Sequence, residues 1–234
     1  YLLDGQHRRE AFLISEKSDG FSDARTCYFK SMAEMGEEFV NLNSRLVSMR
    51  PDDMLRGMEG TLTTLQQIRK ACPYVGYDNI RRSSGSSILS MSLTLRAWET
   101  ARADVPTSSS LSALALASQL HEDDVKLLVN FLNVAFKAWG RDQEYQRLWS
   151  GLNLSLCMWL YRRIVIVQHS AKSIRFTSEQ FSKGLMALSA SATYLDWLVG
   201  RRLSEKDRAP AYSRITSIIG DRLFDDVGKK ISFP

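Results

Sequence analysis

The sequence is poor in the residues that build disulfide frameworks and metal sites, with three cysteines and three histidines in 234 residues. Cys27, Cys72 and Cys157 lie far apart and form no C-x-x-C pair. This argues against a disulfide framework and favours a reducing compartment, so we expect a cytoplasmic protein. The histidines are equally scattered, and no group of residues has the spacing of zinc ligands. The sequence therefore predicts no metal site built from protein side chains alone.

Long apolar runs are also absent. No run reaches the roughly 18 residues that a membrane-spanning helix needs. The stretch 152–167 comes nearest, but Arg162 and Arg163 interrupt it. No secretory signal is visible either. We therefore expect no membrane partner.

The charge is mildly basic, with 31 Lys and Arg against 26 Asp and Glu, a net charge of +5. A small positive charge permits a nucleic-acid partner without requiring one. The hydrophobic fraction of 44% is that of an ordinary globular protein, so the chain can bury a core.

Periodicity divides the chain into two parts. Residues 1–3 and 24–29 have strand character, and 7–16 and 33–43 have helical character, which is the alternation of an α/β unit. After Pro51 the apolar residues recur at helical spacing. The predicted helices cover residues 55–71, 87–103, 125–139, 145–167, 177–198 and 211–227. The expected fold class is α+β and mostly α, with an α/β portion at 1–56 and a helical domain at 57–234.

Two further patterns support the helical domain. Thr177-x-x-Gln180 has the form of a capping box and predicts a helix that begins just after Thr177. All the tryptophans fall on apolar stripes of predicted helices, so we expect them in the core rather than stacked on bases. They are Trp98, Trp139, Trp149, Trp159 and Trp197.

The sharpest chemical signal is the pentapeptide Asp4-Gly5-Gln6-His7-Arg8, placed after a predicted strand and at the first turn of a predicted helix. Free backbone N–H groups and the helix dipole attract anions at such a turn. Gly5 lets a phosphate approach the backbone, and Arg8 offers a bidentate fork to phosphate oxygens. His7 can donate to phosphate or transfer a proton near neutral pH, and Asp4 can orient Arg8 or His7 or help hold a metal ion. The alternative is an ordinary turn with solvated first-turn side chains.

Residues 1–12, YLLDGQHRREAF, resemble the signature of DGQHR-domain proteins in the ParB/sulfiredoxin-like superfamily. Residues 38–45, EFVNLNSR, are similar to the F-x-x-[IL]-N segment that follows in those families. The resemblance covers about residues 1–56 and places a further strand of the pocket upstream of Tyr1. Sulfiredoxins have Cys where this chain has Gln6, and an amide cannot act as a thiolate nucleophile, so their chemistry is excluded.

The resemblance implies that the chain binds, and slowly hydrolyses, a nucleoside triphosphate, ATP or CTP, with Mg²⁺ bridging the phosphates. Asp4, His7 and Arg8 are the implied catalytic residues, and these three with Gly5, Gln6 and Asn43 form the implied nucleotide site. Asn43 also suits a helix C-cap, where Asn is favoured. The family further implies work on DNA within a modification or restriction (defence) system.

Pairs of basic residues recur after residue 80. Arg81-Arg82 and Arg201-Arg202 lie in a connector and at a predicted helix end, so they are the candidate DNA-binding residues. If they converge on one face, they form a phosphate track, and otherwise they are scattered solvated charge. Arg162-Arg163 is a poorer candidate, because it interrupts the most apolar helix and suits pairing within the fold. The competing hypotheses are a non-catalytic adaptor for a partner protein, and a sequence-independent DNA binder without nucleotide.

Overall fold

The computed structural model describes residues 27–46, 49–77, 87–106, 110–141, 148–166, 176–191 and 208–227, together with Glu10, Leu13 and Ile14. For residues 43–46 and 224–227 only the backbone is described. The described chain is mostly helical with a single short pair of strands, which confirms the predicted fold class, α+β and mostly α.

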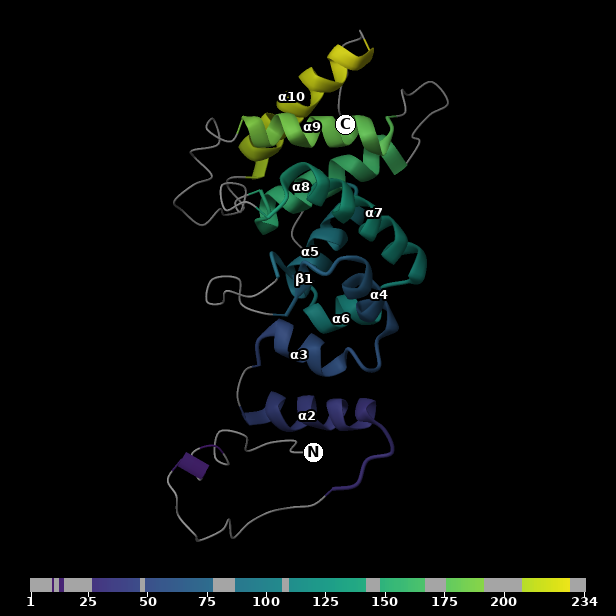
Figure 1. Ribbon diagram of the computed structural model, residues 1–234, viewed down its shortest axis with the longest axis vertical. Coiled ribbons are helices and arrows are strands. Elements are labelled where there is room, and N and C mark those ends of the chain that lie inside the picture. The colour runs from purple at the N-terminus through teal and green to yellow at the C-terminus, as the bar shows by residue number, and fades with distance from the viewer. Residues whose placement is uncertain are drawn as a thin grey trace.

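The elements lie along the long axis of the molecule with α2 near one end and α10 at the other, but not strictly in chain order, since α6 lies back beside α3 (Figure 1). In chain order they are α2 (Met32–Leu46), α3 (Pro51–Met58), α4 (Thr63–Ala71), β1 (Val75–Gly76), β2 (Leu89–Ser90), α5 (Met91–Arg102), α6 (Ala113–Ser118), α7 (Glu122–Trp139), α8 (Gly151–Tyr161), the π-helix η2 (Arg162–Ile166), α9 (Ser178–Ala190) and α10 (Arg208–Val227). β1 and β2 pair in parallel, with Val75 opposite Leu89.

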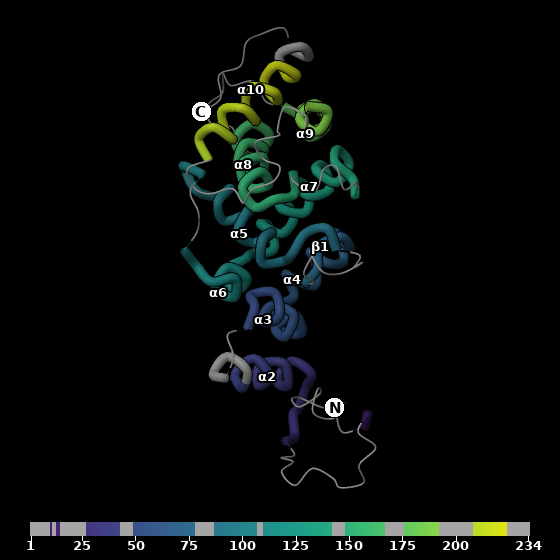
Figure 2. The backbone as a smooth tube through the Cα atoms, turned by 90° about the vertical axis from the view of Figure 1, so that its left-hand side faces the viewer, coloured from purple at the N-terminus to yellow at the C-terminus, as the bar shows by residue number. Residues whose placement is uncertain are grey.

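One apolar cluster runs through the helices from Leu55 in α3 to Leu223 in α10. α5 packs against α8 in its middle, while α9 packs against both α7 and α10 (Figure 2). α8 is buried along its whole length after Leu152, as its nearly uniform apolar sequence predicts. α2 lies at one end of this stack and packs against α3.

Several predicted features are confirmed. Thr177 forms the capping box of α9: its Oγ1 accepts from Gln180 N at 3.1 Å, and Gln180 Oε1 accepts from Thr177 N at 2.9 Å. The stripe predicted for 125–139 faces the core from α7. Four of the five tryptophans are buried, and Trp197 lies outside the described residues.

Other local expectations were wrong. The helix predicted at 55–71 is two helices, α3 and α4, separated by a turn at 59–62. Cys27–Phe29, predicted as strand, has no regular structure, and the strands lie at β1 and β2 instead. The predicted division between residues 56 and 57 stays a prediction; this position lies within α3, whose Leu55 is fully buried in the main core.

Candidate functional site

The predicted nucleotide site lies largely outside the described residues. This holds for all of residues 4–8, the DGQHR pentapeptide. Asn43, the remaining member, lies within the last turn of α2, which continues to Leu46. Asn43 is therefore inside the helix rather than at its C-cap, and the C-cap interpretation was wrong. Its approach to the pentapeptide stays a prediction.

The position of α2, and so of Asn43, depends on a close crossing with α3. A Cβ atom added to Gly36 would lie 2.3 Å from the carbonyl oxygen of Gly57. A Cβ added to Gly57 would lie 2.9 Å from Val40 Cγ2. Two helices approach this closely only where side chains are absent, so these glycines are required by packing rather than by backbone angles. The crossing holds the residue 38–45 segment beside the helical body.

α3 is in turn fixed to α5 by a carboxylate. Asp52 Oδ1 accepts from the backbone N–H of Ser92 at 2.8 Å, and Asp52 Oδ2 accepts from the Ser92 hydroxyl at 2.7 Å. Ser90 caps the same helix, its Oγ accepting from Leu93 N at 3.3 Å. The N-terminus of α5 could have attracted an external anion, but it already holds a carboxylate of the chain itself.

The candidate DNA-binding residues Arg81, Arg82, Arg201 and Arg202 also lie outside the described residues. The first pair belongs to the connector that leaves β1 after Tyr77. There the Arg69 guanidinium lies over the Tyr77 ring, 5.3 Å from its centroid, and Arg69 Nη1 is 2.7 Å from Glu59 Oε2.

The Tyr77 hydroxyl is buried and has no hydrogen-bond partner in the described part of the chain. Burial raises the pKa of Tyr77 above its ordinary value, and the nearby Glu59 carboxylate adds to the rise. The phenol therefore stays protonated at neutral pH and does not act as a base. Arg69 contacts the Glu59 carboxylate and the Tyr77 ring, so its role here is in packing.

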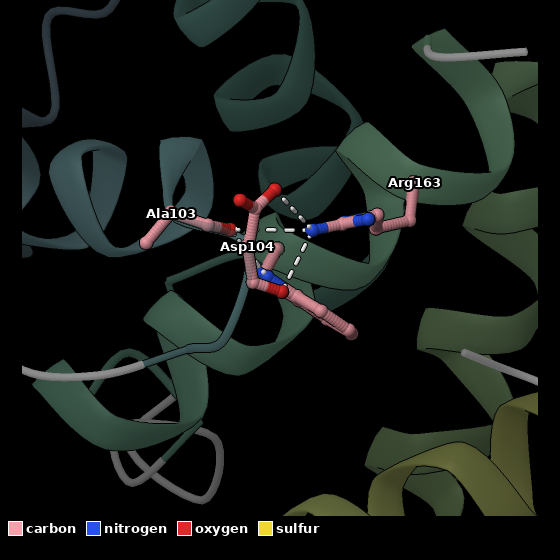
Figure 3. Close-up of polar contacts among 4 residues, drawn as sticks. Ala103, Asp104 and Arg163 are labelled. Carbon is pink, nitrogen blue, oxygen red and sulfur yellow. Dashed lines mark hydrogen bonds and ion pairs between the residues drawn. The ribbon is translucent and has the colours of Figure 1, made fainter. Parts of the chain in front are cut away.

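Arg163 is paired within the fold, as expected from its place in an apolar helix (Figure 3). Its Nη2 donates to the carbonyl oxygen of Asp104 at 2.7 Å and lies 3.5 Å from that of Ala103. The guanidinium also covers the Trp159 ring, 4.9 Å from its centroid. Only 12% of the Arg163 side chain is exposed, so it serves to cap the end of α5 and is not a free surface cation.

The cysteines divide by burial. Cys27 is exposed, whereas Cys72 and Cys157 are buried, and burial raises the pKa of both buried thiols. Within the described ranges no group of three or more His, Cys, Asp or Glu side chains could hold a metal ion. In the same ranges no helix is both long and apolar enough to cross a membrane.

This division predicts thiol reactivity. With the Ellman reagent at neutral pH we expect one thiol of the native protein, Cys27, to react within minutes. Cys72 and Cys157 should react only after unfolding, because the thiolate is the reactive form and the buried thiols are both inaccessible and protonated. A Cys27→Ser variant should then show almost no reactive thiol until guanidinium is added. Rapid reaction of a second thiol in that variant would contradict the burial of Cys72 and Cys157.

No family model, no curated protein and no solved structure matches the chain. The resemblance to DGQHR-domain proteins therefore depends on residues 1–12 and 38–45 alone.

Proposed function

We propose that the chain binds a nucleoside triphosphate, ATP or CTP, at the turn formed by residues 4–8, and that it works on DNA within a modification or defence system. The observation that carries the proposal is the DGQHR pentapeptide, with the EFVNLNSR segment at the family's interval behind it. The structure of α2 is compatible with this pairing, since it places the second motif on a helix held against the helical body.

The proposed chemistry follows from the residue types. The backbone N–H groups after Gly5 and the Arg8 guanidinium hold the phosphates and stabilise the charge that develops during slow hydrolysis. His7 donates to a phosphate oxygen or moves a proton, and Asp4 orients His7 or Arg8. Part of the phosphate charge is neutralised by the Mg²⁺ that accompanies the triphosphate.

Arg8→Ala tests the site. We expect nucleoside-triphosphate affinity, measured by isothermal titration with ATP and with CTP, to fall at least about tenfold, since charge-assisted hydrogen bonds contribute about 1.5–3 kcal/mol. Arg9→Ala is the matched control, because it removes the same charge one residue beyond the pentapeptide. Equal affinities of Arg8→Ala and the parent chain would show that residues 4–8 are not a phosphate site.

The DNA part of the proposal predicts a change in salt dependence. Replacing Arg81, Arg82, Arg201 and Arg202 with Ala should weaken duplex binding for all sequences alike. The slope of log affinity against log salt should become shallower by about 0.9 for each phosphate that the protein no longer neutralises. Fluorescence anisotropy at several salt concentrations measures both effects, with Arg96→Ala and Lys137→Ala, exposed cations of α5 and α7, as controls. An unchanged slope would leave the four arginines as ordinary solvated charge.

A second candidate function, a non-catalytic adaptor for a partner protein, is favoured by exposed apolar side chains in the part of the described chain that precedes α3. Most of the large exposed apolar side chains of the described chain lie before α3. They are Leu13, Ile14, Tyr28, Met32 and Leu42. Exposed apolar side chains of this kind are typical of protein interaction surfaces when they lie on one face. Nucleotide binding by the parent chain that is lost in Arg8→Ala would favour the nucleotide-binding function over the adaptor.

A further inference from the structure

We draw no further inference here: the strongest candidate, the N-terminus of α8, where the Ser150 hydroxyl and the buried Trp149 indole N–H have no hydrogen-bond partner in the described part of the chain, is a helix end with nothing in the structure to show that these two groups point at a common ligand.

Discussion

Gly36→Ala is expected to separate α2 from α3, although the substitution adds a single methyl group. The new Cβ would lie 2.3 Å from the Gly57 carbonyl oxygen, and this neighbour is backbone, which cannot rotate away. We expect a cost of about 2–3 kcal/mol, at the upper end for overpacked sites, because the helices must move apart by about 1 Å to reach ordinary contact. Hydrogen exchange of the α2 amides measures the effect, since α2 packs mainly on α3 among the described elements.

Gly151→Ala provides the matched control. Gly151 is the first residue of α8, and a Cβ there would meet Leu93 at 3.6 Å, an ordinary contact. The same substitution should therefore be neutral, or stabilise the helix by up to about 1 kcal/mol through the lower backbone entropy of the unfolded chain. Unchanged exchange of α2 in Gly36→Ala, with protection like that of Gly151→Ala, would show that the two helices do not cross as described.

The glycines also explain why the sequence predicted one helix where the structure has two. Apolar residues recur at helical spacing at Leu65, Ile68 and Cys72, and Leu55 precedes them in the sequence. Periodicity alone therefore favours one continuous helix from 55 to 71. Gly57 and Gly60 belong to the contact with α2, and the chain turns at 59–62 to start α4. A contact with another helix is not visible in local periodicity, and the prediction failed there.

Elements whose determinants are local were predicted correctly. The apolar stripe of α7 and the capping box of α9 each depend only on residues of their own helix and its cap, at spacings set by helix geometry. β1 and β2 are separated in the sequence by the connector that follows Tyr77, and each contributes two residues to the pair. Segments this short show no alternating pattern from which a strand could be predicted. For the candidate site, α2 confirms a helix through Asn43, while the role of residues 4–8 stays a prediction.

The arginine that interrupts the apolar run predicted a contact within the fold, but the sequence did not identify the residues that it would contact. Arg163 binds backbone carbonyls at the end of α5, about 60 residues earlier in the chain. Trp159 donates from Nε1 to one of them, Ala103 O, at 3.0 Å, and stacks under the guanidinium. Tyr212 of α10 packs edge-on against Trp159, with ring centroids 5.5 Å apart. One cation thus joins α5 to η2 beside α10.

Arg163→Ala should lower the free energy of unfolding by about 2–4 kcal/mol, because it removes charge-assisted hydrogen bonds and a desolvated cation–π contact together. The midpoint of urea denaturation, followed by tryptophan fluorescence and circular dichroism, measures the loss.

Two variants show which contact matters. Asp104→Ala should leave the midpoint nearly unchanged, because the Asp104 carboxylate is fully exposed and lies 3.4 Å from the guanidinium, and the backbone carbonyl remains. Arg163→Lys should lie between the parent and Arg163→Ala, since it keeps the charge but loses the planar fork that reaches two carbonyls and covers Trp159. If Asp104→Ala were as destabilising as Arg163→Ala, the exposed ion pair rather than the carbonyl cap would hold the end of α5.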